Sequence, residues 1–315
     1  MVIIISDEKD TSTNEVVDWI GLEKQFSLIR NSTSRVTSVK LSDQQIRLNL
    51  NGIDLCDVKS YWYRRGSLKM HSGLKISKNE QSPIEMIFQS TQLDLERLQN
   101  YFDIHLTELD CISLGSFLHN KVNKLHNLQI AKSVNLSIPK TIITNSRQDL
   151  IDYFGSVSII VKPIGEAQVY MDKKHEVYTY TSIVDIDKLE ETFPISLFQE
   201  KVDKKYEIRT FVLEDSCYSM AILSQNNEQT AVDFRNYDFQ FPNRKVPYTL
   251  PPKIEDQVFN FMKKINLKSG SVDFIVTPED EHIFLEVNPI GQFGMVSKPC
   301  NYNIEKKIAD YLTNY

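Results

Sequence analysis

The chain opens with an unbroken apolar run that gives way to a charged, polar stretch. The run at Val2–Ser6 is too short to cross a membrane and predicts a buried strand. A helical stretch near Glu15–Ile20 and a second strand at 26–30 follow it. Residues 46–55 alternate apolar and polar positions around an Asn-Gly dipeptide, which is typical of a tight hairpin. The first third is therefore expected to begin strand–helix–strand and to continue with a hairpin.

The middle of the chain mixes helical and strand-like patterns. Residues 58–66 predict a strand with an aromatic body and a basic end, and a long helix is expected from Pro83 to about Phe102. Another helix is expected over Lys121–Asn135, with a stop at Pro139. Further strands are expected just after Pro139 and at 158–164, 177–184, 196–202, 206–213, 217–223 and 230–235.

The last sixty residues hold the clearest pattern. Lys253–Leu267 predicts an amphipathic helix, and the segments SVDFIV and HIFLEVN predict a hairpin around an acidic turn at 277–281. A short helix from about Ile304 closes the chain. Because strands and helices mix without strict alternation, we expect an α/β protein with mixed α+β lobes. The expected divisions fall at 1–119, 120–195 and 196–315.

Composition narrows the class of protein. With 315 residues, 41% hydrophobic and 25% charged, the chain matches an ordinary globular protein of several lobes. A net charge of −6 disfavours a nucleic-acid partner. Neither a signal peptide nor a membrane span is expected. The cysteines are scattered and favour neither a zinc site nor a disulfide framework, so a reducing cytoplasm is the expected location; they are Cys56, Cys111, Cys217 and Cys300.

Three polar residues of the final hairpin are candidates for a metal site. Alternation places Glu286 and Asn288 on one face of their strand, with Ile283, Leu285 and Val287 on the other. If the two strands pair, Asp273 converges on the same sheet surface. Mg²⁺ prefers such hard oxygen ligands. A hairpin with a solvated outer face explains the two acidic residues equally well, and the hairpin alone does not decide between these readings.

Other polar residues lie where they could contact a phosphorylated ligand. Lys162 follows a buried strand, and Lys124 lies on the preceding helix; either could reach a phosphate or be an ordinary surface lysine. The segment FQEKV at 198–202 could offer backbone groups to an adenine ring between lobes, or be a plain linker strand.

Arginine interrupts two apolar strands, which is unfavourable without a partner. Arg209 and Arg235 could face phosphates, while Asp233 could simply pair with Arg235. The basic end of the segment WYRR (62–65) is compatible with a binding rim or with side chains that cover an edge strand.

Taken in order, these segments resemble the ATP-grasp superfamily. The resemblance rests on Lys124 before IPKTIIT, Lys162 in IIVKPIG, then FQEKV, EIR and DF…FLEVNP, and it spans residues ~120–295. A narrower likeness covers nearly the whole chain: VIIIS…STNEVVDWI, YWYRRG, LSIPKTIITN, YEIRTFVL and the D-x-R of Asp233–Arg235 are similar to graspetide synthetases, the microviridin-type peptide macrocyclases, in their grasp-with-spasm maturase group.

The resemblance implies an ATP-grasp fold behind an N-terminal α/β domain, with a central lid subdomain at 120–195 and a C-terminal subdomain at 196–315. It also implies ATP and Mg²⁺ as cofactors. The enzyme would phosphorylate an Asp or Glu side chain of a ribosomal precursor peptide, and a Ser, Thr or Lys side chain of that peptide would then attack to give an ester or amide. A leader segment would bind outside the active site, and the related synthetases suggest a homo-oligomer.

The implied residue roles fall into three groups. Metal binding is assigned to Asp273, Glu286 and Asn288, and transfer chemistry to Arg209, Arg235 and Asp233. Nucleotide binding is assigned to Lys124, Lys162, Gln199, Glu200, Lys201, Val202 and Glu207. One departure concerns the lid: many ATP-grasp proteins carry several glycines after Lys-Pro, whereas KPIGEAQVY supplies only Gly165, followed by Glu166. Two alternatives stay open, a glutamate-ligase-like enzyme acting on a small molecule or protein tail, and a nucleotide-binding module without ligation.

Overall fold

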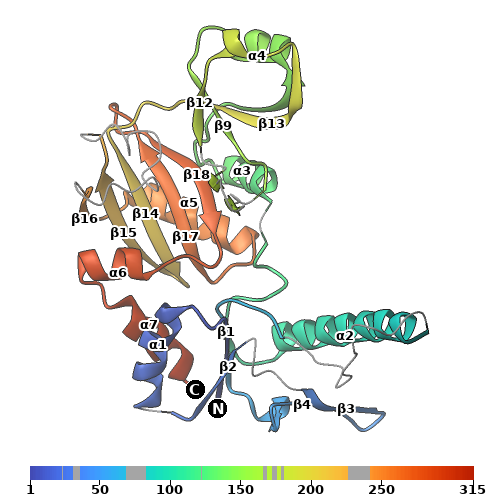
Figure 1. Ribbon diagram of the computed structural model, residues 1–315. Helices are drawn as coiled ribbons and strands as arrows, with labels where there is room; N and C mark the ends of the chain where they lie inside the picture. Colours follow the sequence, from blue (N-terminus) through green and yellow to red (C-terminus); the bar gives the residue numbers. More distant parts are fainter. Residues whose placement is uncertain are drawn as a thin grey trace. The chain divides into compact units, whose positions relative to one another are not determined.

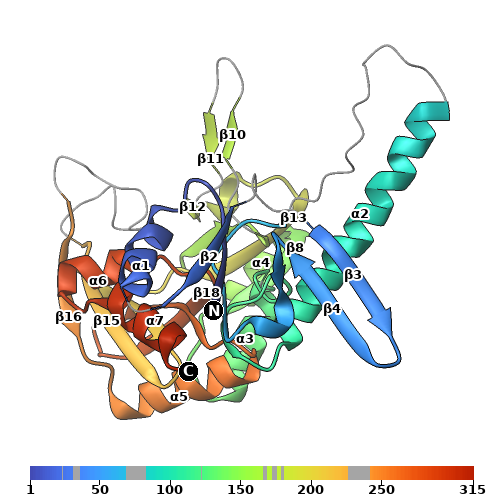
Figure 2. The ribbon, with the colours of Figure 1, turned by 90° about the horizontal axis from the view of Figure 1, so that it is seen from below.

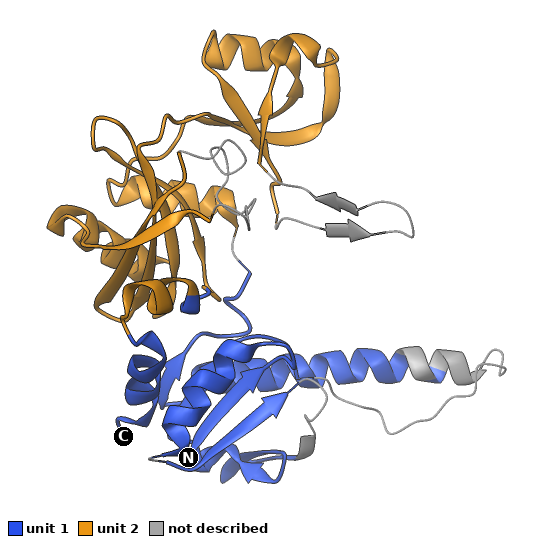
Figure 3. Ribbon diagram, turned by 60° about the vertical axis from the view of Figure 1, so that its left-hand side comes forward, with its two compact units in different colours: residues 1–121, 292–294, 303–315 blue, residues 122–291, 295–302 orange. Residues whose placement is uncertain are grey.

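The computed structural model describes residues 1–22, 24–30, 36–68, 83–121, 123–165, 169–171, 176–178, 181–225 and 242–315. These form two compact units (Figure 3). Unit 1 comprises residues 1–121, 292–294 and 303–315, and unit 2 comprises residues 122–291 and 295–302. The chain therefore leaves unit 1, builds unit 2 and returns to unit 1 at its C-terminal helix.

Unit 1 is built on a parallel sheet of order β2-β1-β6-β7. Its strands are β1 (Val2–Ser6), β2 (Phe26–Arg30), β6 (Ser60–Tyr63) and β7 (Ile112–Leu114). The apolar run of β1 is buried at every position, as expected of a central strand. Helix α1 (Thr11–Gly21) begins at the N-cap Asp10 and packs against the C-terminal helix α7 (Ile304–Thr313). The predicted strands at 2–6 and 26–30 are confirmed.

A second, three-stranded sheet of unit 1 contains the predicted hairpin (Figure 2). Strands β3 (Val36–Ser42), β4 (Gln45–Leu50) and β5 (Ile53–Asp54) pair in sequence order, and a short 3₁₀ turn covers Leu55–Asp57. Asn51 and Gly52 both have positive φ, at 54° and 84°, as this tight turn requires. Helix α2 (Pro83–Glu108) continues six residues beyond the predicted end.

Arg64, in the basic end of the segment WYRR, neither lines a binding rim nor covers an edge strand. Strand β6 lies inside the sheet, and the Arg64 side chain is buried. Its Nε lies 3.1 Å from Asp10 Oδ2, and its guanidinium stacks 5.0 Å from the centre of the Phe293 ring. Burial lowers the pKa of Arg64 to about 10, and Asp10 partly offsets this effect. Arg64 is therefore a buried structural cation of unit 1.

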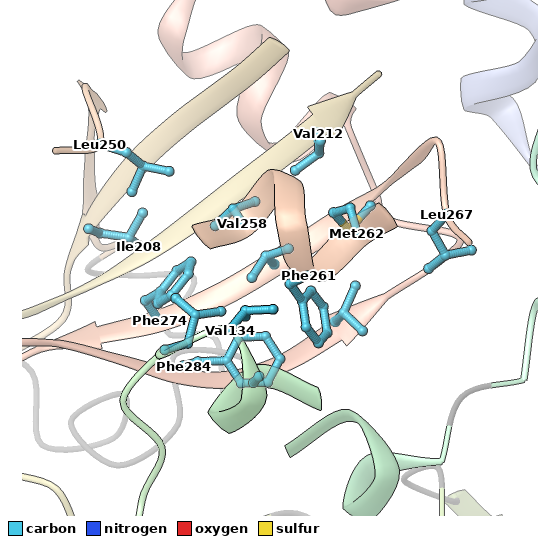
Figure 4. Close-up of a cluster of buried hydrophobic side chains, with 14 of the residues drawn as sticks. Val134, Ile208, Val212, Leu250, Val258, Phe261, Met262, Leu267, Phe274 and Phe284 are labelled. Carbon is cyan, nitrogen blue, oxygen red and sulfur yellow. The ribbon is translucent and has the colours of Figure 1, made fainter. Parts of the chain in front are cut away.

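The larger sheet of unit 2 is antiparallel, with the order β16-β15-β14-β17-β18. Its strands are β14 (Tyr206–Leu213), β15 (Ser216–Leu223), β16 (Arg244–Tyr248), β17 (Ser269–Val276) and β18 (His282–Asn288). The predicted final hairpin is confirmed as β17 and β18. Helices α3 (Lys124–Ser133) and α5 (Pro252–Lys264) pack on one face of this sheet (Figure 1), and Phe261, Phe274 and Phe284 lie together in the core (Figure 4). A short helix, α6 (Gly294–Cys300), follows the sheet.

A smaller sheet of unit 2 has the order β12-β9-β13-β8. Its elements are β8 (Thr141–Ser146), α4 (Arg147–Phe154), β9 (Ile159–Lys162), β12 (Ser182–Val184), a 3₁₀ turn at Ile186–Lys188 and β13 (Thr192–Glu200). Leu150 and Phe154 of α4, which the sequence analysis does not predict, pack with Ile159 and Phe198. We refer to this sheet and α4 as the lid subdomain.

Some boundaries differ from the predicted ones. The strand predicted at 177–184 is two strands, β11 (Glu176–Tyr178) paired with β10 (Val169–Met171), and β12 paired with β9. The strand predicted at 230–235 lies outside the described residues. The division into 1–119, 120–195 and 196–315 stays a prediction; its second boundary falls inside β13, and α7 belongs to unit 1.

Candidate active site

Three charged side chains form a row across the large sheet of unit 2. Arg209 on β14 is the direct partner of Asp273 on β17, which is in turn the direct partner of Glu286 on β18. Neighbouring residues Ile208 and Val272 belong to the core on the opposite face. The register therefore places the row on the face of the sheet that points away from this core.

A β-bulge lies within this row. Asp273 pairs with Glu286 but Phe274 pairs with Phe284, so Leu285 is an extra residue of β18. Both Phe284 and Val287 join the hydrophobic core, which strict alternation does not allow. The prediction that Ile283, Leu285 and Val287 share the apolar face is therefore wrong. The bulge shifts the alternation by one residue, so that Phe284 takes the core position on the N-terminal side of Leu285. The register supports the predicted common face of Asp273 and Glu286.

Arg209 and Asp273 form an ion pair in a nearly buried setting. The guanidinium Nη1 lies 3.5 Å from Asp273 Oδ2, and the two side chains are 7% and 12% exposed. The Arg209 Nε is buried and has no hydrogen-bond partner within the described part of the chain. A buried donor of this kind is expected to find an acceptor.

Glu286 has a different cationic neighbour, Lys124, at 4.0 Å between Oε2 and Nζ. Lys124 is the first residue of α3, directly after the N-cap Asn123. A positive charge at the N-terminus of a helix interacts unfavourably with the helix dipole. Stabilisation of α3 therefore does not explain the position of Lys124. The Lys124 Nζ also donates to the Pro163 carbonyl, 3.2 Å away, next to Lys162 at the end of β9. Lys124 therefore links Glu286 on β18 to Pro163, the residue that follows β9.

Asn288 ends β18 opposite Ser271 of β17. Its Oδ1 accepts a hydrogen bond of 3.0 Å from the Ile290 N–H, which fixes the turn after the strand. Gly291 lies so close to Ser271 that a Cβ on the glycine would stand 2.1 Å from Ser271 Oγ. Gly291, predicted only as a strand stop, is thus required by a close approach of the chain.

The segment FQEKV is tied into the lid subdomain. Gln199 is buried, and its Nε2 donates to Thr141 Oγ1 at 3.0 Å. The N–H groups of Glu200 and Lys201 donate to the carbonyls of Lys140 and Ser158. The Glu200 carboxylate accepts from the Lys140 N–H. These bonds hold the end of β13, and the nucleotide-binding role of Gln199, Glu200, Lys201 and Val202 stays a prediction.

Glu207, at the start of β14, lies in a buried polar cluster. Lys204 Nζ forms an ion pair with its Oε1, and Ser224 Oγ donates to the same oxygen at 3.2 Å. The sequence analysis missed Lys204, because nothing in VDKKYE distinguishes it from the exposed Lys205. The remaining predicted residues, Asp233 and Arg235, lie outside the described part of the chain.

The oxygen atoms of the three candidate metal ligands are of the chemical type that Mg²⁺ prefers. The two carboxylates and the amide oxygen of Asp273, Glu286 and Asn288 lie on neighbouring strand positions of one hairpin, and Mg²⁺ takes one or two carboxylates together with phosphate oxygens and waters. Among the described residues, no group of three or more His, Cys, Asp or Glu side chains is placed to hold a metal ion.

Comparison with known proteins identifies the family of this chain. The RimK-like ATP-grasp domain family matches residues 121–312, which is more than half of the chain. No curated protein matches the sequence. The chain therefore belongs to the RimK-like ATP-grasp family and is an ATP-dependent ligase.

Several similar solved structures contain a bound peptide. A RiPP-associated ATP-grasp ligase from Chryseobacterium gregarium, in complex with ADP and a leader and core peptide, has a TM-score of 0.81 and 24% identity, over 99% of this chain and 96% of that chain. The macrocyclase MdnC from Microcystis aeruginosa, bound with the precursor peptide MdnA, has a TM-score of 0.75 and 26% identity, over 100% and 99%. The ligase PsnB, complexed with a phosphomimetic variant of its minimal precursor, Mg and ADP, has a TM-score of 0.72 and 15% identity. The match covers 99% of this chain and 97% of that chain.

In the part of the chain that the structure describes, no helix is long and apolar enough to span a membrane.

Proposed function

We propose that the protein is a peptide macrocyclase, which activates Asp or Glu side chains of a ribosomal precursor and links them to Ser, Thr or Lys side chains of the same peptide. The observation that carries this proposal is the likeness to peptide-bound ligases over the whole chain, including unit 1.

The proposed metal ligands are Asp273, Glu286 and Asn288, at the end of the β17–β18 hairpin. When bound there, Mg²⁺ neutralises charge on the phosphates and orients them. Lys124 and Lys162 hold the phosphates as point charges. Gln199, Glu200, Lys201, Val202 and Glu207 hold the adenosine end.

In the first chemical step, an oxygen of the peptide carboxylate attacks the γ-phosphorus of ATP, and ADP leaves. The product is an acyl-phosphate. Arg209 stabilises the charge that develops on the transferring group, which gives its buried Nε an acceptor. Arg209 is held for this role by Asp273.

In the second step, a hydroxyl or amine of the same peptide attacks the acyl carbon. Phosphate leaves and a proton is released, so the peptide loses one water for each ester or amide formed. Exclusion of bulk water protects the acyl-phosphate from hydrolysis. Asp233 and Arg235 are assigned, from the sequence alone, to the acceptor carboxylate or the attacking group. The protein is further proposed to be a homo-oligomer in the cytoplasm. It would bind the leader segment of the precursor outside the active site.

Mass spectrometry tests the proposal. The protein is incubated with ATP, Mg²⁺ and short Ser/Thr- and Asp/Glu-rich peptides encoded beside its gene, with Arg209→Lys as the inactive control. We expect the peptide mass to fall by one water per cross-link, with one ADP formed each time. A peptide mass that rises by an added amino acid identifies a tail-adding ligase instead, and unchanged masses with every neighbouring peptide refute macrocyclisation.

A further inference from the structure

Two cationic side chains each contact one of the carboxylates assigned to the metal. Arg209 Nη1 lies 3.5 Å from Asp273, and Lys124 Nζ lies 4.0 Å from Glu286. Asp273 and Glu286 are direct cross-strand partners, and two like charges in this position repel each other. The cations therefore offset a repulsion that the metal also relieves.

The two cations differ in how firmly they are held. Arg209 and Asp273 are nearly buried, whereas Lys124 and Glu286 are 23% and 25% exposed. Lysine carries its charge at the end of a flexible four-carbon stem, so its ammonium can move to a new partner at little cost. Lys124 begins α3, and its Nζ already contacts the Pro163 carbonyl beside Lys162, the other proposed phosphate ligand.

From this geometry we infer that Lys124 couples metal binding to nucleotide binding. Its ammonium competes with a divalent cation for Glu286, and the phosphates of a nucleotide draw it away from that carboxylate. The metal site then gains affinity when the nucleotide is present, and the nucleotide site gains affinity when the metal is present, because such coupling is reciprocal. The inference rests on the metal and phosphate roles proposed above.

The test uses Mn²⁺ alone, followed by electron paramagnetic resonance, and ADP alone in the presence of a chelator, followed by calorimetry. Lys124→Gln is expected to raise the affinity for Mn²⁺ alone by about threefold to tenfold, since one partly exposed competing charge is removed, and to weaken ADP binding. Glu286→Gln is expected to do the opposite, weakening Mn²⁺ binding and strengthening metal-free ADP binding.

Lys132→Gln is the matched control, because it removes the same charge from the exposed last turn of the same helix. It should change neither affinity. Weaker or unchanged Mn²⁺ binding in Lys124→Gln overturns the inference, as does unchanged metal-free ADP binding in Glu286→Gln. No readout needs a peptide, so these results are independent of whether the protein is a macrocyclase.

Discussion

Arg209 and Asp273 are direct partners across β14 and β17, and their side chains form a nearly buried ion pair. Removal of one charge from such a pair leaves the other buried and unpaired, which typically costs about 3–5 kcal/mol. The same two side chains are assigned to catalysis and to the metal. Stability and activity should therefore respond differently when both are replaced.

A double-mutant cycle separates these two contributions. Arg209→Met and Asp273→Leu should each lower the free energy of unfolding, whereas the double variant should lower it by less than their sum, because no buried charge is left unpaired. Activity should be lost in all three variants. Urea unfolding and ADP release measure the two quantities, and strictly additive losses of stability would show that the pair is not coupled.

Gly291 provides a test of the turn that follows β18, the strand of the proposed metal ligands Glu286 and Asn288. A Cβ at this position would stand 2.1 Å from Ser271 Oγ and 2.6 Å from the Ser271 N, so Gly291→Ala must displace the turn that holds Asn288. Small displacements of catalytic groups can reduce turnover by about 10²-fold. Gly294→Ala is the control, since nothing lies within 4 Å of its Cβ position. Equal ADP release by the two variants would contradict the prediction.

Asp103 of α2 should give unit 1 a pH-dependent stability. Burial raises the pKa of Asp103 from 3.8 to about 7, although a hydrogen bond from Gln99 opposes this. The folded state therefore binds the proton more tightly than the unfolded state does. The contribution of Asp103 to the free energy of unfolding is therefore fully present below about pH 4. It is lost as the pH rises through about 7.

Asp103→Asn should accordingly flatten the fall in stability between pH 4 and pH 7, while Asp94→Asn, on the exposed part of the same helix, should not. The measurement is urea unfolding followed by tryptophan fluorescence. Because the two tryptophans, Trp19 and Trp62, both lie in unit 1, this signal reports on that unit alone. The same slope in Asp103→Asn and in the wild type would contradict the raised pKa.

Arg64 and Arg65 share the carboxylate of Asp10 but should contribute unequally to stability. The Arg64 side chain is 5% exposed and the Arg65 side chain 36%. Arg64→Ala should therefore destabilise unit 1 by about 3 kcal/mol or more, because Asp10 is left in a buried site and the contact with Phe293 is lost. Arg65→Ala should cost about 1 kcal/mol or less. Tryptophan fluorescence during urea unfolding compares them, and equal losses would show that burial does not set the difference.

Sequence patterns predict those parts of the fold that depend only on residues close together in the sequence. The apolar run of β1, the Asn51-Gly52 turn and the amphipathic α5 follow from nearest-neighbour chemistry and periodicity. Alternation also places Glu286 and Asn288 on one face of β18, because the bulge at Leu285 lies outside this two-residue step.

Other features depend on contacts that no local pattern encodes. The bulge at Leu285 changes the phase of β18, and only the pairing with β17 reveals it. Lys204 and Lys205 are adjacent and identical in type, yet Lys204 is 4% exposed with Glu207 while Lys205 is 48% exposed with Asp280. The burial of Arg64 follows from the position of β6 inside the sheet, which depends on strand order rather than on its own sequence.

The discontinuity of unit 1 has a consequence for how the protein is made. Helix α7 supplies Ile304, Ile308 and Leu312 to the interior of unit 1 and packs against α1, which lies near the other end of the chain. Domains generally fold as units while the chain emerges from the ribosome. The first part of unit 1 is translated before unit 2, but α7, which completes unit 1, is translated after all of unit 2. A newly made chain therefore carries an uncovered apolar surface on α1 until α7 has been translated.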